Sequence, residues 1–151
     1  MKGTYTIDIE RPREDVFAFL DDEKNLPKMV PNLVDQGLIH ETPEKVGTTF
    51  WHVYEENGRR MRMTGVVTEH RPPERMAVKL DGAFFGLEVA YELEELGPTS
   101  TRLTQLSDAR FKHVFKLMGV LFGRKMEREG KQAQVETFAR MKAMIEEGPS
   151  A

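Results

Sequence analysis

Histidine and tyrosine side chains are the groups in this chain best suited to move a proton or to orient a bound molecule. The sequence has 151 residues and no Cys, which excludes disulfides, thiolate catalysis and Cys-based zinc sites. No H-x-x-x-H or H-E-x-x-H spacing joins the four histidines, His40, His52, His70 and His113. We therefore expect no metal site. G-x-S-x-G, the P-loop and G-x-G-x-x-G are also missing, and we expect no cofactor.

His52 is the strongest candidate for a chemical role among the histidines, because the strand pairing predicted below places it on the inner face of a sheet. In an apolar cavity it could act as a general acid or base in an enolising cyclisation or a dehydration. The simpler interpretation, which we favour, is a hydrogen-bonded or partly solvated histidine near the cavity mouth. Tyr54, Tyr91 and Gln105 are the other polar groups able to orient a ligand in a mostly apolar pocket. Alternatively, each tyrosine buries its ring while its hydroxyl reaches water.

The composition predicts a single domain over residues 1–151. There are 22 Lys and Arg against 25 Asp and Glu, a net charge of −3, and 39% of the residues are hydrophobic. A chain of this length buries enough surface for one core. A pI of about 5.9 disfavours a nucleic-acid partner, which needs clustered Lys and Arg. Without a signal-peptide pattern or an apolar stretch long enough to span a membrane, we expect a cytoplasmic protein.

The N-terminal segment has the pattern of a strand, two short helices and a second strand. Residues 4–10 alternate apolar and polar side chains, as a half-buried strand does. Pro12 begins a short amphipathic helix, and Pro27 and Pro31 leave room for one further helical turn. Residues 33–41 form the second strand, whose inward face the sequence leaves open.

A hairpin follows, because Asn57-Gly58 is the strongest short signal for a two-residue turn. This turn predicts that His52 pairs with Met63. It also pairs Phe50 with Gly65 and Tyr54 with Met61. These residues all share one face of the two strands.

Two further turns extend the sheet into an antiparallel meander. One is the corner at Pro72-Pro73, and the other is a second two-residue hairpin signal at Asp81-Gly82. The pairs that these turns predict are Val67 with Met76, Gly65 with Val78, Val78 with Phe85 and Met76 with Leu87.

All three turns agree on which residues share the inner face of the meander. That face consists of Phe50, His52, Tyr54, Met61, Met63, Val67, Met76, Val78, Leu80, Phe85, Leu87, Val89, Tyr91 and Leu93. The outer face is expected to be exposed to solvent, and it carries Arg60, Arg62, Lys79, Glu88, Glu92 and Glu94.

The turn at Gly97–Ser100 leaves two registers for the last strand. An odd loop turns Leu103, Gln105 and Ser107 inward, whereas a four-residue loop turns Thr104 and Leu106 inward. We favour the odd loop.

Residues 111–147 predict one long helical segment at the C-terminus. No proline interrupts it, and Phe138, Met141 and Ile145 continue a stripe that begins at Gln134. A straight helix of this length would be roughly 52 Å long, which exceeds the width of a small domain. We therefore expect a break near Gly119 or Gly123.

This order of elements is that of the α+β helix-grip fold, in which a curved seven-stranded antiparallel sheet wraps around a long C-terminal helix. The segment IERPREDVFAFLDD resembles the opening of the START-like (SRPBCC) superfamily, in its polyketide cyclase/dehydrase and lipid-transport branch. Further similarity follows in order at KVGTTF, GVVTEHRPPERMAV, STRLTQ and FARMKAMIEE, so that it spans roughly residues 4–147. The chain departs from many relatives near Met29, where they have a tryptophan in a W-x-P context.

The resemblance implies a cavity between the sheet and the last helix that holds a hydrophobic or amphipathic small molecule, lipid or polyketide-like. It carries over no catalytic residues. Several inward methionines suit a pocket that adapts to varied ligands, and they suit a plain core equally. The expected ligand-binding residues are Phe50, His52, Tyr54, Met61, Met63, Met76, Val78, Phe85, Leu87, Val89, Tyr91, Gln105, Met118, Phe122, Phe138 and Met141.

Two other functions compete with ligand binding. One is a cyclase or dehydratase that uses the same cavity with His52 as its catalytic group. The other is an interaction module that dimerises or docks a partner through Trp51, Val53 and Val66 on the outer face. We expect a binding protein rather than an enzyme.

The segment from Phe111 to Lys125 is basic and amphipathic, a composition able to make transient contact with an anionic membrane surface. The interpretation that we favour for it is packing over the cavity entrance or in a homodimer.

Overall fold

The computed structural model describes residues 2–112 and 115–148. Within the second range, only the backbone is described at positions 115, 118, 119, 121, 122, 126 and 127. His113 and the side chains of Met118 and Phe122 therefore lie outside the described residues. The elements are β1 (Lys2–Ile9), α1 (Arg13–Asp21), the 3-10 turn η1 (Glu23–Asn25), α2 (Leu26–Met29), β2 (Leu33–His40), β3 (Thr49–Glu56), β4 (Arg59–Arg71), β5 (Arg75–Asp81), β6 (Phe85–Gly97), β7 (Ser100–Phe111) and α3 (Phe115–Glu147).

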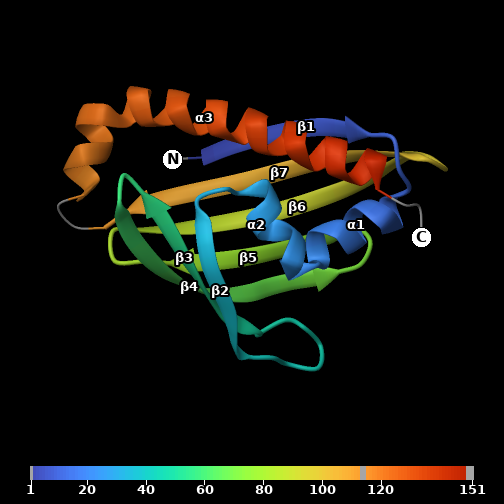
Figure 1. Cartoon of the computed structure of the whole chain (residues 1–151), viewed down its shortest axis with the longest axis horizontal. Coiled ribbons are helices and arrows are strands. Elements are labelled where there is room, and N and C mark those ends of the chain that lie inside the picture. Colours follow the sequence, from blue (N-terminus) through green and yellow to red (C-terminus); the bar gives the residue numbers. More distant parts are fainter. Residues whose placement is uncertain (1, 113–114, 149–151) are drawn as a thin grey trace.

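The seven strands form one antiparallel sheet in the order β1-β7-β6-β5-β4-β3-β2. The sheet is strongly curved, and α3 runs along it with α1 and α2 beside its C-terminal part (Figure 1). Strands that follow each other in sequence pair directly, except that β1 returns to pair with β7. This is the helix-grip architecture that the order of predicted elements indicated.

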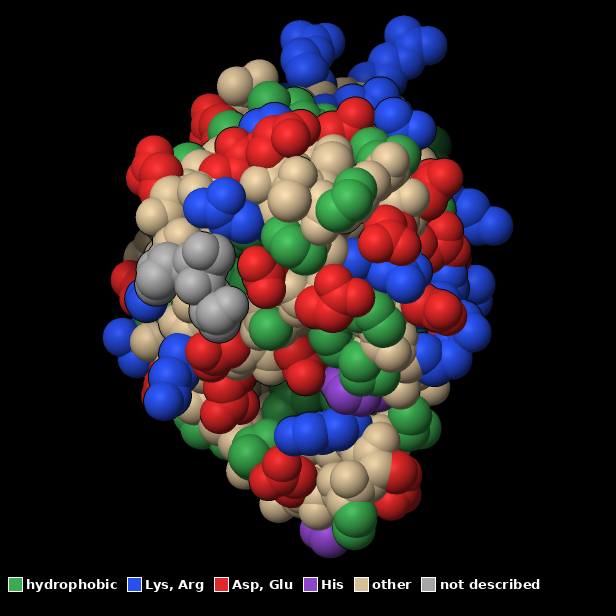
Figure 2. All heavy atoms as spheres, turned by 90° about the vertical axis from the view of Figure 1, so that its right-hand side faces the viewer, with side chains coloured by type: hydrophobic (Ala, Val, Ile, Leu, Met, Phe, Trp, Pro, Cys, Tyr) green, Lys and Arg blue, Asp and Glu red, His purple; other side chains and the backbone are tan. Residues whose placement is uncertain are grey.

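The β3–β4 hairpin has the predicted register. Asn57 and Gly58 both adopt positive φ, as a two-residue hairpin turn requires. His52 pairs with Met63, and the neighbouring inward pairs are Phe50 with Gly65 and Tyr54 with Met61. On the opposite face Arg60 and Arg62 are exposed. At the end of the molecule that carries the C-terminus, acidic and basic side chains are interspersed over the surface (Figure 2).

The predicted pairing of β4 with β5 is wrong by two residues. Gly65 pairs with Leu80 rather than Val78, and Val67 pairs with Val78 rather than Met76. A β-bulge between Val67 and Glu69 then shifts the register by one residue. The bulge was not visible in the alternation of side chains, because it inserts an extra residue without changing the residue types on either side.

The second predicted hairpin is also wrong, because Asp81-Gly82 does not form a two-residue turn. Asp81 still pairs with Gly86, and the amide of Gly82 donates to the carbonyl of Phe85 across a wider loop at 3.0 Å. The predicted pairs Val78 with Phe85 and Met76 with Leu87 are therefore replaced by Val78 with Val89 and Met76 with Tyr91. In both cases the register differs from the predicted one by an even number of residues, so the same side chains face inward.

The last strand has the register of the odd loop. Leu103, Gln105 and Ser107 face Leu93, Tyr91 and Val89, and an irregularity between Glu95 and Gly97 supplies the odd residue. On the far side β1 continues this face by pairing Tyr5 with Gln105 and Ile7 with Leu103. In β2, the face that the sequence left open is resolved by pairing Leu33 with Tyr54 and Gln36 with His52.

Helix α3 is continuous over 33 residues, about 50 Å, so the predicted break near Gly119 or Gly123 is wrong. Its first turns are angled to the remainder of the helix (Figure 1). A glycine inside a helix costs only about 1 kcal/mol relative to alanine, too little to end a helix whose other residues favour it. The first turns of α3 project beyond the core, and Val120 in this part is 81% exposed.

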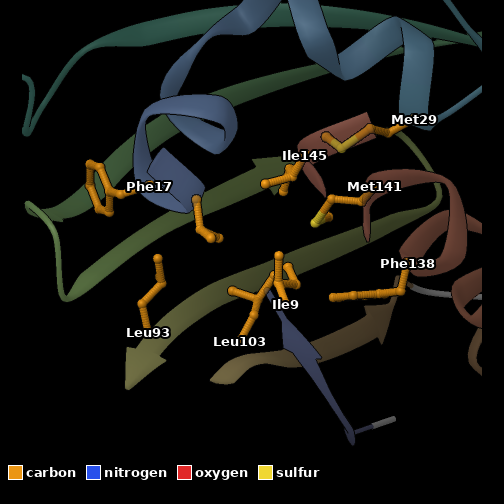
Figure 3. Close-up of a cluster of buried hydrophobic side chains, with 9 residues drawn as sticks. Ile9, Phe17, Met29, Leu93, Leu103, Phe138, Met141 and Ile145 are labelled. Carbon is orange, nitrogen blue, oxygen red and sulfur yellow. The ribbon is translucent and has the colours of Figure 1, made fainter. Parts of the chain in front are cut away.

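The hydrophobic core lies under the C-terminal half of α3. Its members come from β1, α1, α2, β6, β7 and α3, and they are Ile9, Val16, Phe17, Met29, Leu93, Leu103, Phe138, Met141 and Ile145 (Figure 3). Basic side chains hold this half of the helix in place. Lys142 donates to the carbonyl of Asp8 at 2.7 Å, Arg140 to that of Met29 at 3.2 Å, and Arg11 to those of Glu146 and Gly148.

Candidate ligand-binding site

The inner face of the sheet carries both buried and half-buried side chains along β6. Leu93, over the core, is 4% exposed and Val89 is 9% exposed, whereas Tyr91, Leu87 and Phe85 on the same face are half-buried. The strand begins near the first turns of α3 and runs toward the end of the molecule that carries the C-terminus (Figure 1). The inner face beyond the core is largely apolar, with half-buried positions beside buried ones such as Met63 and Leu80.

His52 is a buried polar group on this part of the inner face. It is 8% exposed, and its Nδ1 atom lies 3.0 Å from the hydroxyl oxygen of Tyr54. The ring of Phe50 lies 4.8 Å away on the same strand. Burial lowers the pKa of His52 from 6.5 to about 4, because the charged imidazolium loses its hydration there. His52 is therefore neutral at pH 7, with one ring nitrogen that donates and one that accepts.

The two inward tyrosines keep their protons over the whole physiological range. Burial raises the pKa of Tyr54 to about 12. Burial also raises the pKa of Tyr91 to about 12, and the nearby Tyr54 adds to the effect. Each hydroxyl is therefore a neutral hydrogen-bonding group, able to donate to or accept from an oxygen atom of a ligand.

A glutamine pair lies at the edge of the core. The side-chain amide of Gln134 on α3 donates to the side-chain oxygen of Gln105 on β7 at 3.1 Å. One helical turn further on, Phe138 packs against Tyr5 with ring centroids 4.7 Å apart. The pair thus ties α3 to the sheet beside Tyr91, which is the neighbour of Gln105 on β6.

Most of the predicted ligand-binding residues share the inner face of the sheet. These are Phe50, His52, Tyr54, Met61, Met63, Met76, Val78, Phe85, Leu87, Val89, Tyr91 and Gln105. Phe138 and Met141 lie elsewhere, since each is 1% exposed within the core cluster. The side chains of Met118 and Phe122 lie outside the described residues, so their assignment stays a prediction.

A second histidine, His70, also faces inward, although the sequence placed only His52 on this face. The bulge in β4 places His70 opposite Met76. Its Nε2 atom lies 3.0 Å from the Asp21 carboxylate, and its ring lies edge-on to Phe17 at 5.5 Å. His70 therefore joins β4 to α1, and no pattern in the sequence indicated this because the bulge reverses the alternation.

Gln36 and Gln134 are two further polar groups that the predicted ligand-binding set omitted. Gln36 is the partner of His52 on β2, and its side-chain amide donates to the carbonyl of Glu23 at 2.9 Å. The helical stripe already placed Gln134 on the sheet-facing side. The inward orientation of Gln36 could not be predicted, because a bulge in β2 between Leu33 and Asp35 interrupts the alternation of side chains.

Two open clefts are lined by described residues, and both lie away from His52. One, of about 450 Å³, lies between α1, α2 and the end of α3, and includes Arg11, Asp15 and Lys28. The other, of about 550 Å³, includes Arg71 and Glu92. Both carry many charged side chains, so neither matches the predicted apolar pocket between the sheet and α3, which stays a prediction. Among the described residues no His, Asp and Glu side chains group as metal ligands would.

The curved sheet, the long helix along it and the neutral polar groups on an apolar inner face are those of a helix-grip protein. Comparison with known sequences identifies the family. The chain belongs to the polyketide cyclase / dehydrase and lipid transport family, whose model matches residues 1–146. No curated protein matches the sequence.

Solved structures share this fold at low sequence identity. TTHA0849 from Thermus thermophilus is 13% identical, with a TM-score of 0.78 over 96% of this chain and 97% of that chain. The Zhui aromatase/cyclase from a Streptomyces species is 12% identical, with a TM-score of 0.79 over 97% of this chain and 93% of that chain. A START superfamily protein from Mycobacterium smegmatis is 18% identical, with a TM-score of 0.66 over 86% of this chain and 92% of that chain.

Within the described ranges, no helix has the length and apolar character needed to cross a membrane.

Proposed function

We propose that the protein binds a hydrophobic or amphipathic small molecule, lipid or polyketide-like, between the sheet and α3, with residues 1–151 acting as one binding domain. The observation that carries the proposal is the group formed by His52, Tyr54 and Tyr91. These side chains are neutral at pH 7, and they lie on a mostly apolar inner face where several side chains are only half-buried. Such a combination is typical of sites for small apolar ligands.

The two kinds of side chain have different tasks in this site. Apolar burial supplies the affinity, at roughly 25 cal/mol for each Å² of ligand surface removed from water. The neutral donors and acceptors fix the orientation of the ligand oxygens. The inward residues of β3 from Phe50 to Tyr54, and of β6 from Phe85 to Tyr91, include no charged side chain at pH 7. A ligand that buries its polar atoms here as neutral hydroxyl or carbonyl groups therefore meets matching partners.

A cyclase or dehydratase in the same cavity is the alternative, and the contact between His52 and Tyr54 favours it most. The lowered pKa of His52 counts against it. A general acid or base works best when its pKa lies near the working pH. With a pKa of about 4, His52 is a weak base and is almost never protonated at pH 7, which fits a hydrogen-bonding role better.

The third function, an interaction module, would use Trp51 on the outer face. The guanidinium of Arg62 lies 5.2 Å from the centre of the Trp51 ring. A Cβ added at Gly37 would lie 2.7 Å from the same ring, so the indole packs directly over that glycine. Trp51 is thus partly covered by its own neighbours, which supports a structural role for it.

Native mass spectrometry of the gently purified chain, followed by solvent extraction, tests the proposal. We expect a retained small molecule, or saturable binding of the neutral apolar dye Nile red that fatty-acyl or polyketide-like compounds displace. Dye binding that no such compound displaces would contradict it. A dimer mass that depends on protein concentration, with neither retained ligand nor dye binding, would establish the interaction module instead.

A further inference from the structure

The start of α3 differs in charge from the rest of the chain. Residues 110–131 contain seven Lys and Arg and two Glu, a net charge of +5 in a chain whose total is −3. On α3 the exposed cations of the described part are Lys116, Arg124, Lys125, Arg128 and Lys131. The opposite end of the molecule has acidic and basic side chains interspersed (Figure 2). The start of α3 therefore carries a local excess of positive charge.

Apolar side chains are exposed among these cations. Leu117 is 59% exposed and Val120 is 81% exposed, and Phe84 in the loop between β5 and β6 is 45% exposed. Lys112 links the two segments, because its amide donates to the carbonyl of Phe84 at 2.9 Å and its Nζ atom lies 2.6 Å from the carboxylate of Asp81.

This loop and the first turns of α3 form one end of the molecule, at the left of Figure 1. We call it the basic end and define it by Phe84, Lys112, Lys116, Leu117, Val120, Arg124 and Lys125.

We propose that the basic end docks on the surface of an anionic lipid membrane. Cations gain from the negative headgroups, and each one near such a surface strengthens binding by about fivefold. The exposed leucine, valine and phenylalanine gain only from an apolar phase, which begins just beneath those headgroups. A nucleic acid or an acidic protein would satisfy the cations and leave these three side chains in water. The lipid surface is the partner that accommodates both.

The docking surface goes beyond the proposed function and does not depend on the identity of the ligand. The core and the backbone contacts of Lys142, Arg140 and Arg11 hold the C-terminal half of α3. The basic end lies at the other end of the helix, where β6 begins (Figure 1). If the ligand of the proposed function enters the inner face at this end, a membrane docked there lies next to its entrance.

Co-sedimentation of the full chain with lipid vesicles tests this inference. We expect binding to mixed phosphatidylcholine and phosphatidylglycerol vesicles, weaker binding at high salt because the charges are screened, and far weaker binding to phosphatidylcholine alone. Changing Arg124→Glu together with Lys125→Glu removes two cations and should weaken binding at least about 25-fold. The matched control is Lys24→Glu with Lys28→Glu, an equal change of charge at two exposed positions near α2, and it should keep most of the binding.

A second variant separates the apolar contribution from the electrostatic one. Leu117→Ser with Val120→Ser should weaken vesicle binding at low and high salt alike, while the melting temperature stays close to that of the wild type because both side chains are already exposed. Equal loss of binding in the control and in the Arg124 and Lys125 variant would overturn the proposal. So would wild-type binding to an acidic polypeptide with no binding to vesicles. A wild-type chain that binds Nile red but no vesicles would overturn the docking surface alone, whereas one that binds vesicles but neither Nile red nor a retained ligand would contradict the proposed function alone.

Discussion

The Nδ1 atom of His52 and the hydroxyl oxygen of Tyr54 lie 3.0 Å apart on the inner face of β3. The two residues are neighbours on that face because alternate residues of a strand point to the same side. Their rings meet edge to face, with centroids 5.8 Å apart, and Phe50 lies next to His52. The contact orients the imidazole, which burial keeps neutral at pH 7, and it is the part of the site that is easiest to test.

Replacing His52 with glutamine separates a binding protein from an enzyme. We expect His52→Gln to change the affinity for a polyketide-like or fatty-acyl ligand by less than tenfold, because one neutral hydrogen bond contributes about 0.5–1.5 kcal/mol. Loss of a general acid or base would instead cost about 10²–10⁴-fold in rate. Dye displacement and product analysis on both proteins measure the two quantities. A hundredfold fall in product formation with nearly unchanged affinity would establish the enzyme.

Acid should destabilise the protein in part through His52. Above pH 6.5 the residue is neutral in both the folded and the unfolded chain, and its protonation has no effect on stability. Between pH 6.5 and about 4 the unfolded chain binds a proton that the folded chain does not, so stability of up to about 3 kcal/mol is lost as the pH falls. Urea unfolding at pH 7 and pH 4 should show a smaller loss for His52→Gln than for the wild type. Identical losses would show that the pKa of His52 is not lowered.

Neighbouring residues on β4 should respond oppositely to charge changes. Met63 is 2% exposed on the inner face, whereas Arg62 is exposed on the outer face beside Trp51. Met63→Arg should abolish Nile red binding and lower the melting temperature, because it buries a charge without a partner. Arg62→Glu should leave dye binding intact and cost only the contact with Trp51, about 0.5–1 kcal/mol. Dye binding lost in Arg62→Glu and kept in Met63→Arg would mean that the two faces are reversed.

Gly65 should be the least replaceable glycine of the inner face. A Cβ there would collide with the Phe50 ring and would lie 2.8 Å from a methyl carbon of Leu80. Gly65→Ala should therefore destabilise the fold by about 1–3 kcal/mol, and Phe50→Ala in the same chain should remove part of that penalty.

The control for this change is Gly130→Ala in α3, where an added Cβ meets no described atom within 4 Å. Because alanine favours a helix more than glycine does, this variant should be more stable by roughly 0.5–1 kcal/mol. Thermal and urea unfolding measure both changes. A stabilising Gly65→Ala would show that the Phe50 ring does not lie over the glycine.

Most of the inward side chains of the meander could be predicted from the sequence. Alternation in a strand has a period of two, so a turn misplaced by two or four residues leaves every side chain on the same face. For this reason the inner set that includes His52, Tyr54 and Tyr91 was predicted, although the partners of Val67 and Val78 were wrong. The Asn57-Gly58 turn was local enough for its register to be predicted directly.

Features that depend on inserted residues or on distant contacts could not be predicted from the sequence. The bulge between Val67 and Glu69 turns His70 inward toward Asp21, and no alternation pattern records an inserted residue. The bond between Gln105 and Gln134 joins segments that meet only after α3 packs on the sheet, and so the boundary of the core could not be located from the chain. The lowered pKa of His52 has the same origin, because desolvation depends on every atom packed around the ring rather than on its neighbours in sequence.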